Sequence, residues 1–515
     1  MSARAGRVLM VGIDAAEPTL VDSLLRRGRL PTLARLRQQG RTGLLDSPAR
    51  WYSGAVWPTF YTGQRVPWHG LYHNKLWHPS RMCCEVPDER RFTARPFWEA
   101  PSMATLRKCV VDVPLIRGHP RPINGLYLNG WATHDVAPLV SHPAGLQREL
   151  RRLVGARAMP AEAYGRQDAR GLLQLSGELR QTNAQLHRLG TQLLGREEWD
   201  FACIIVGTTH RAGHYLWDLD QTRDAASLAP AQRATLLGAV EALYEDADHA
   251  LGELLRVAGA DTRVLVFSLH GMGPNGGWSD VVPDLLQAWR AARGGRAVRT
   301  GSLYRVREAL VGIARPMLRH VPPSLAAQLV PLWSARMFDW SRTESFPLPM
   351  DLTAMLRINL AGRERLGIVT PGADYERCCR ELESFFHSLR DAASGQPLVR
   401  DIVRPYELAP LEAPHRDGQP DVLVRWNALR TSAVPVVESS LLPGFRFEVP
   451  RWLTSGRSGN HLPTGWFVAT GPGVTAGATA ATADILDLAP TARSLLGLEP
   501  DPSLHGRVLP LLEPA

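Results

Sequence analysis

The chain has 515 residues, of which 44% are hydrophobic and 21% charged. This is enough to bury one very large α/β core or two smaller ones. The net charge is +9, and almost every basic residue is arginine, since only Lys75 and Lys108 are lysines. No basic stripe interleaved with aromatic residues is present, so we expect no nucleic-acid partner.

Targeting signals and cysteine usage point to a cytoplasmic protein. No run approaches the roughly 18 apolar residues that a membrane helix needs, and the apolar stretch 8–13 is too short for a signal peptide. The six cysteines form two vicinal pairs and two singles, which make a poor disulfide framework. These are Cys83, Cys84, Cys109, Cys203, Cys378 and Cys379. We therefore expect a reduced, cytoplasmic protein with no integral membrane segment.

The first part of the chain predicts a strand followed by helices. The apolar stretch Arg7–Ile13 predicts a strand that delivers the carboxylate of Asp14 at its end. Leu20–Gln39 carries apolar residues at helical spacing. Gly28 and Pro31 are expected to split it into two short helices, with Pro31 opening the second.

Residues 76–200 are expected to form a mixed insertion. They contain a short strand at 109–114 and a long helical stretch at 161–194. Two strongly apolar segments follow, Phe201–Val206 and Arg263–Phe267. Continuous apolar character is typical of central parallel strands buried on both faces. The helix predicted at 230–257 would be the crossover that joins them.

Residues 281–345 are expected to form a helical cap. Two amphipathic segments lie there, at 306–318 and 325–333, and we favour a lid over the site above a helix that lies on a membrane. The core strand 466–470 and a final helix at 485–496 close the chain. The sequence thus predicts a doubly wound α/β fold with a mostly parallel sheet, as a single domain over residues 1–515 with capping insertions.

Five potential metal ligands lie near predicted strand ends, where an open α/β sheet presents ligand-binding residues. They are Asp14, His210, His214, His270 and His461. Each has a structural alternative, such as a helix cap for Asp14. His210 and His214, four residues apart, would fall on one face of a helical turn and can share an ion. Together the five predict a metal site, and the imidazole-rich set suits zinc best.

A nucleophile can be sought among the hydroxyls of the segment 53–62. A serine hydroxyl is a poor nucleophile unless a base or a metal ion lowers its pKa. No Gly-x-Ser-x-Gly elbow surrounds Ser53, so a base-activated triad is not expected. Coordination to a divalent ion would activate it. Thr59 and Thr62 are rival hydroxyls in the same segment, and Ser53 could instead be an ordinary loop hydroxyl.

Several short motifs, in order, carry a resemblance to a known family. They are Gly12-Ile13-Asp14, Thr62-Gly63 with Pro67-Trp68-His69-Gly70, Asn359 to Glu364, Gly367 to Val369, Pro420-Asp421, His461, and Asp487 to Thr491. In this order the chain resembles the type I phosphodiesterase/nucleotide pyrophosphatase branch of the alkaline phosphatase superfamily. The resemblance implies an alkaline-phosphatase-like fold. Counted back from Thr62-Gly63, Ser53 occupies the position of the family's nucleophile.

The resemblance also implies a division of the ligands. Asp14, Ser53 and His270 would hold one ion that activates the attack of Ser53 on phosphorus. A second ion would be held by the three remaining candidates, His210, His214 and His461.

Two positions depart from the family's pattern. His210 stands where the family usually has aspartate, which keeps a ligand atom but loses a charge. Leu269 stands where the family has an aspartate ligand, and leucine cannot bind a metal. Uncompensated positive charge in a partly dry site is costly, so the chain would hold one or two divalent ions. Glu17 or Asp280 could supply the missing charge.

The function that follows is a metal-dependent hydrolase of phosphodiester or nucleotide pyrophosphate bonds that acts through a phosphoseryl intermediate. Its substrate would be a small-molecule phosphate ester. A sulfate or phosphate monoesterase would use the same site, as would a phosphoryl-group transferase. A metal-degenerate binding protein without turnover is a further alternative, motivated by Leu269.

Overall fold

The computed structural model describes residues 6–87, 94–116, 123–133, 139–157, 159–160, 165–294, 338–453, 455–479 and 481–512. The chain folds into two compact units. The larger comprises Met1–His69, Phe92–Asn275 and Leu453–Ala515, and the smaller comprises Gly70–Arg91 and Gly276–Trp452. Each unit has its own hydrophobic core.

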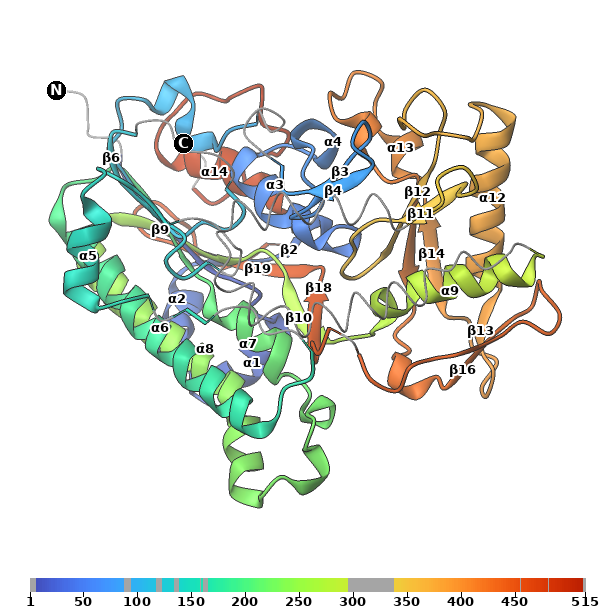
Figure 1. Ribbon diagram of the computed structural model, residues 1–515. Helices are drawn as coiled ribbons and strands as arrows, with labels where there is room; N and C mark the ends of the chain where they lie inside the picture. Colours follow the sequence, from blue (N-terminus) through green and yellow to red (C-terminus); the bar gives the residue numbers. More distant parts are fainter. Residues whose placement is uncertain are drawn as a thin grey trace. The chain divides into compact units, whose positions relative to one another are not determined.

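The larger unit is built on a ten-stranded sheet in the order β20-β2-β19-β9-β1-β8-β5-β6-β7, with β21 beside β2. Figure 1 labels β2, β6, β9 and β19 of this sheet. The strands are β1 (Arg7–Ile13), β2 (Arg41–Asp46), β5 (Lys108–Val111), β6 (Gly125–Asn129), β7 (Val140–His142), β8 (Phe201–Val206), β9 (Thr262–Ser268), β19 (Thr464–Thr470), β20 (Gly477–Ala478) and β21 (Ala483–Asp484). The central strand β1 pairs in parallel with both β8 and β9. β19 runs antiparallel to β9 and β2, and β7 runs antiparallel to β6. The predicted mostly parallel sheet is confirmed.

Strands β5, β6 and β7 lie within residues 76–200, which we predicted as a mixed insertion. The structure places them in the central sheet instead. All four residues of β5 are buried, and Cys109 lies in register with Ala202 of the core strand β8. Because β5 pairs with β6 on one edge and with β8 on the other, the segment belongs to the central sheet.

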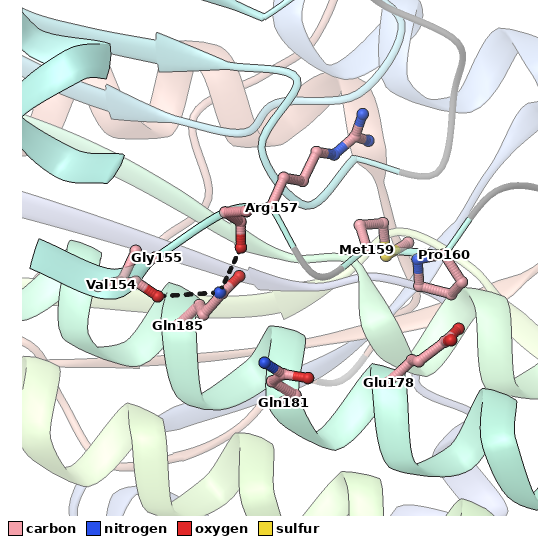
Figure 2. Close-up of a pocket in the computed structure, with 9 residues that line it drawn as sticks. Val154, Gly155, Arg157, Met159, Pro160, Glu178, Gln181 and Gln185 are labelled. Carbon is pink, nitrogen blue, oxygen red and sulfur yellow. Dashed lines mark hydrogen bonds between the residues drawn. The ribbon is translucent and has the colours of Figure 1, made fainter. Parts of the chain in front are cut away.

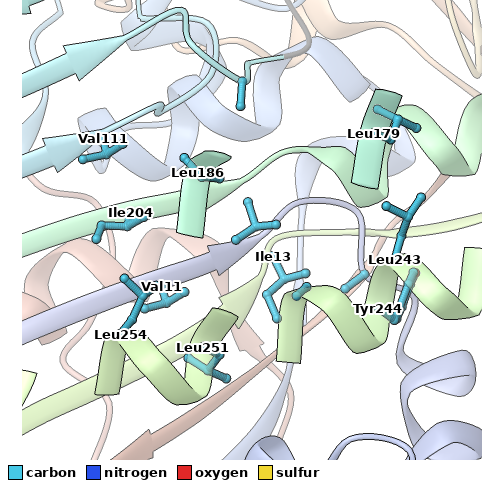
Figure 3. Packing of buried hydrophobic residues seen from close by; sticks show 14 of the residues in the cluster. Val11, Ile13, Val111, Leu179, Leu186, Ile204, Leu243, Tyr244, Leu251 and Leu254 are labelled. Carbon is cyan, nitrogen blue, oxygen red and sulfur yellow. The ribbon is translucent and has the colours of Figure 1, made fainter. Parts of the chain in front are cut away.

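Helices cover both faces of the sheet, as in a doubly wound fold. On one face, α1 (Pro18–Arg26), α2 (Pro31–Gln39), α6 (Ala169–Arg196) and α8 (Pro230–Ala258) share a hydrophobic cluster with the strands. Figure 3 shows Val11 and Ile204 of the sheet facing Leu254 of α8 within that cluster. On the other face, Phe60 of α3 (Val56–Thr62) packs on Phe267 of β9 with ring centroids 4.9 Å apart. Phe267 alternates with the clustered Val266, so it points to the opposite side of the strand.

The sequence located the main helices of this unit. Gly28 adopts a left-handed φ of 68° between α1 and α2, and Pro31 is the first residue of α2, as predicted. The crossover helix predicted at 230–257 is α8. The larger unit also contains α4 (Val66–His69), α5 (Leu146–Val154), α7 (Thr208–Leu216) and α14 (Leu488–Leu495).

The smaller unit is antiparallel. Its main sheet has the order β11-β12-β15-β14, formed by β11 (Ser345–Pro347), β12 (Ala354–Ile358), β15 (Val422–Trp426) and β14 (Val399–Val403). Helices α9 (Trp278–Ala292) and α12 (Ala373–Ser388) contribute to its core. The remaining elements are β3 (Leu76–His78), β4 (Cys83–Glu85), β13 (Leu389–Asp391), α13 (Pro405–Leu408), β16 (Val436–Ser439) and β17 (Arg446–Glu448). The amphipathic segments predicted at 306–318 and 325–333 lie outside the described residues.

The family-like motifs of the smaller unit form a buried charge network. Arg363 donates to both carboxylate oxygens of Asp421, at 2.7 and 2.6 Å. Arg357, which is fully buried, donates to Glu364 at 2.7 Å. Removal of one partner of a buried ion pair is strongly destabilising, because it leaves the other charge buried and uncompensated. These motifs therefore serve the architecture of this unit.

Two further sequence-based expectations concern cysteines and the membrane. All six cysteines are free, and burial raises the pKa of Cys109 to about 12, so this thiol stays protonated and unreactive. In the part of the chain that the structure describes, no helix combines the length and apolarity needed to cross a bilayer.

Candidate metal centre

Three adjacent parallel strands end at the same edge of the sheet and deliver polar side chains there. Asp14 directly follows β1, α7 with its two histidines follows β8, and His270 follows β9. Because β9, β1 and β8 are neighbours in this order, their carboxyl ends meet. This is the edge at which open α/β sheets bind ligands.

Helix α7 presents His210 and His214 one turn apart, with ring centroids 4.6 Å from each other. Both side chains are buried. The Nδ1 atom of His214 lies 2.9 Å from the carbonyl oxygen of Gly459. Since a carbonyl can only accept, Nδ1 carries the proton and the lone pair is on Nε2. A backbone carbonyl that fixes the tautomer in this way is typical of metal-binding histidines.

His461, from a distant part of the sequence, lies beside His210 and His214. It lies on β18 (Gly459–Leu462), which pairs antiparallel with β10 (Gly271–Pro274), and it stands opposite Met272. A Cβ on Gly459 would lie 2.0 Å from the carbonyl oxygen of Gly213. Only glycine therefore allows β18 to approach α7 closely enough for His461 to meet the histidines of the helix.

The three histidines form a compact, buried group. Nε2 of His210 and Nε2 of His461 are 2.8 Å apart, and one ligand nitrogen from each of the three lies within 4.8 Å of the others. A single ion with metal–nitrogen bonds of about 2.1 Å would draw such atoms together. Three imidazoles with converging nitrogens fit a divalent transition metal, and zinc is the ion that this donor set suits best.

Asp14 and His270 form a second half of the centre. Nε2 of His270 lies 3.5 Å from Oδ1 of Asp14. Nδ1 of His270 lies 3.0 Å from the carbonyl oxygen of Gly271, so Nδ1 carries a proton. Nε2 faces a carboxylate oxygen, and a cation between the two atoms would bind to both. The His270 and His461 ring centroids are 4.7 Å apart, so the two halves adjoin.

Side chains that sequence reasoning missed hold the turn after β1. Ala15 adopts a left-handed φ of 58°, which is strained for a residue with a Cβ. Thr209 donates to the carbonyl oxygen of Asp14 at 2.6 Å, and Ser268 accepts from the backbone N–H of Ala16 at 2.9 Å. Ser268 also donates to the carbonyl oxygen of His270 at 2.9 Å, which links the two ligand-bearing turns. No sequence pattern marks the contacts to Asp14 and Ala16, because they join residues 195 and 252 positions apart.

The hydroxyls of the segment 53–62 differ in their surroundings. Thr59 Oγ1 is bonded to Nε2 of the buried His69 at 3.0 Å. Thr62 donates to the carbonyl oxygen of Pro58 at 2.6 Å. Both threonines thus have structural partners within the motif. Ser53 begins the 3₁₀ turn Ser53–Ala55, directly before α3, and is only partly buried.

Glu17 and Asp280, the two carboxylates that could replace the missing aspartate, lie at two different helical elements. Glu17 caps α1, accepting from Thr19 Oγ1 at 2.6 Å and from the Leu20 N–H at 2.7 Å. Asp280 lies in α9 of the smaller unit. Leu269 itself is 1% exposed. An apolar side chain therefore occupies a buried position beside His270.

A separate cavity of about 610 Å³ lies beside α6. Figure 2 shows Gln185 at its wall, donating to the carbonyl oxygens of Val154 and Ala156 at 3.0 and 2.7 Å. None of the six candidate site residues lines this cavity. This cavity is thus distinct from the histidine centre.

Comparisons with known proteins support the family resemblance. The model of the type I phosphodiesterase/nucleotide pyrophosphatase family matches residues 8–324, more than half of the chain. No curated protein matches. Phosphonoacetate hydrolase from Sinorhizobium meliloti 1021, solved in complex with phosphonoacetate, is 15% identical, with 96% of each chain covered and a TM-score of 0.52. Its complex with phosphonoformate gives 14% identity, the same coverage and a TM-score of 0.52.

Human ectonucleotide pyrophosphatase/phosphodiesterase 5 is 11% identical, with 96% of each chain covered and a TM-score of 0.49. At these identities the phosphonoacetate hydrolase structures show the fold alone. The match of the family model decides the assignment. This chain belongs to the type I phosphodiesterase/nucleotide pyrophosphatase family, and it is a hydrolase of phosphoryl esters.

Proposed function

We propose that the chain is a metal-dependent phosphodiesterase or nucleotide pyrophosphatase that uses Ser53 as its covalent nucleophile. The observation that carries this proposal is the convergence of His210, His214 and His461, all buried and with ligand nitrogens within 4.8 Å of one another. Three buried imidazoles with converging nitrogens offer ligand atoms to one ion. They suit an ion.

The residues would hold zinc in two places. His210, His214 and His461 would hold one ion, and Asp14, His270 and Ser53 would hold the other. Bound zinc would offset the charge of the phosphoryl oxygens and lower the pKa of a coordinated hydroxyl. The metal preference rests on the donor set, since three imidazoles favour zinc over magnesium or calcium.

Ser53 would carry the chemistry in two in-line displacements. In the first, its Oγ forms a bond to phosphorus, its proton leaves to solvent, and the bond to the leaving alcohol or phosphate breaks. In the second, water attacks the same phosphorus from the opposite side and the Ser53 Oγ–phosphorus bond breaks. Ser53 is favoured over its two rivals because it is only partly buried, whereas Thr59 and Thr62 are each only 3% exposed.

A substrate panel tests this proposal. Wild-type protein supplied with zinc should hydrolyse bis(p-nitrophenyl) phosphate faster than p-nitrophenyl phosphate or p-nitrophenyl sulfate. Chelation should remove the activity, and zinc should restore it. A preference for either monoester would favour the monoesterase alternative, and turnover that requires an added alcohol acceptor would favour a transferase.

A further inference from the structure

The carboxylate of Asp14 has a hydrogen-bond donor on the helix that follows the candidate nucleophile. Nε1 of Trp57 donates to Oδ1 of Asp14 at 3.1 Å. Both side chains are almost fully buried, Trp57 at 2% and Asp14 at 1% exposure. An indole has one N–H and no acceptor, so its role toward the carboxylate is fixed as that of donor.

The indole is itself held in place. Its ring lies 5.8 Å from that of Phe60 on the same helix and 6.4 Å from that of Phe267 on β9, measured between centroids. Phe267 belongs to the strand that leads to His270. Trp57 is therefore packed between the helix that follows Ser53 and the strand that positions a second candidate ligand.

The contact is made to the same oxygen of Asp14 that faces His270. Oδ1 receives the indole N–H at 3.1 Å, while His270 Nε2 lies farther away, at 3.5 Å from the same oxygen. A hydrogen bond to a ligating carboxylate is a common way for a protein to orient it. A buried carboxylate without hydrogen bonds costs free energy. The indole N–H therefore also lowers the cost of burying Asp14 when no ion is bound.

We propose that Trp57 is a positioning residue, which orients Asp14 for metal binding and ties it to Ser53. Trp57 lies four residues after Ser53, at the start of the helix that continues the turn beginning at Ser53. One short helical segment thus carries the candidate nucleophile and the donor to the candidate ligand. This inference rests on the proposed function for the role of Asp14, but not on the identity of the substrate.

The chain offers a matched control. Trp98 is fully buried in the same unit, against Phe97 and Phe201. Its Nε1 makes no hydrogen bond within the described part of the chain. Replacing either tryptophan by phenylalanine removes the same atoms from a buried aromatic cluster, but only Trp57→Phe removes a hydrogen bond to Asp14.

Zinc titration calorimetry of the metal-free full-length protein tests the inference. We expect two binding events in wild type, a tight one at the three histidines and a weaker one at Asp14 and His270. Trp57→Phe should weaken only the weaker event, by about 10- to 100-fold, as expected for loss of a hydrogen bond to a metal ligand. Trp98→Phe should leave both events unchanged, whatever it does to thermal stability.

Several results would overturn the inference. These are an unchanged isotherm for Trp57→Phe, equal weakening of both events, or a single event in wild type, which would show that Asp14 holds no ion. If Trp57→Phe does not fold, Trp57→His keeps a ring N–H and should fall between wild type and Asp14→Ala in affinity for the weaker event. An affinity equal to that of Asp14→Ala would also refute it. Failure of the proposed function would look different: no phosphodiester hydrolysis by wild type, with the calorimetric pattern intact.

Discussion

The substitution Leu269→Asp restores the carboxylate that the family places beside His270. Leu269 is 1% exposed, so the new charge would be buried next to the Asp14–His270 half of the centre. At an effective dielectric constant near 20, unit charges about 4 Å apart attract by about 4 kcal/mol. Part of this gain is offset by desolvation of the carboxylate. Zinc binding at the weaker site should therefore tighten by at least about tenfold, or about 1.4 kcal/mol.

The same change should cost stability when no metal is present. Loss of a buried leucine side chain costs about 2–5 kcal/mol, and an unmetallated buried carboxylate adds to that cost. Zinc binding should restore part of the lost stability, about 2.7 kcal/mol at a zinc concentration 100 times the dissociation constant. Thermal unfolding with and without zinc should thus show a larger metal-induced shift for Leu269→Asp than for wild type.

Two control variants separate charge from packing. Leu269→Asn supplies an oxygen ligand without a charge, and Leu269→Ala removes only the apolar contacts. By zinc calorimetry, Leu269→Asp should bind the weaker ion more tightly than either control. Equal tightening by the asparagine would refute the charge argument. Two equally tight sites in wild type would show that another residue replaces the missing aspartate.

Three further outcomes are expected. Ser53→Ala should reduce phosphodiester hydrolysis to the background rate with an unchanged circular dichroism spectrum, whereas Thr59→Ala and Thr62→Ala should keep measurable turnover; the opposite pattern would move the nucleophile to a threonine. His461→Ala should lose the tight zinc ion, by elemental analysis after dialysis, and an unchanged zinc content would show that the histidines do not share an ion. Ala15→Gly should raise the free energy of unfolding in urea by up to about 1 kcal/mol. Relief of the left-handed φ is worth about 1–2 kcal/mol, which exceeds the added entropy cost of glycine, about 0.5–1 kcal/mol. A decrease in the free energy of unfolding would show that the turn is unstrained.

The parts of the fold set by local patterns could be predicted from the sequence. Phe201–Val206 is a strand with the predicted bounds because six consecutive apolar residues suit a site buried on both faces. Pro31 opens α2 because its missing N–H costs nothing at that position. The four-residue spacing of His210 and His214 predicted a shared helical face, and α7 provides it.

Features that depend on tertiary contacts could not be predicted. The strand β5 is only four residues long, and its membership of the central sheet follows from pairing with β8, about 90 residues later in the sequence. The indole of Trp57 and the left-handed turn at Ala15 follow from packing around Asp14. The division into two units had no signal in composition, because proline and glycine are spread along the whole chain.

The central claim is that Ser53 forms a covalent bond to phosphorus, and the stereochemical course of hydrolysis tests it most directly. A phosphorothioate diester that is chiral at phosphorus would be hydrolysed in isotopically labelled water by wild-type protein with zinc. Two successive in-line displacements predict net retention of configuration at phosphorus. Net inversion would mean that water attacks phosphorus directly, and it would contradict the account.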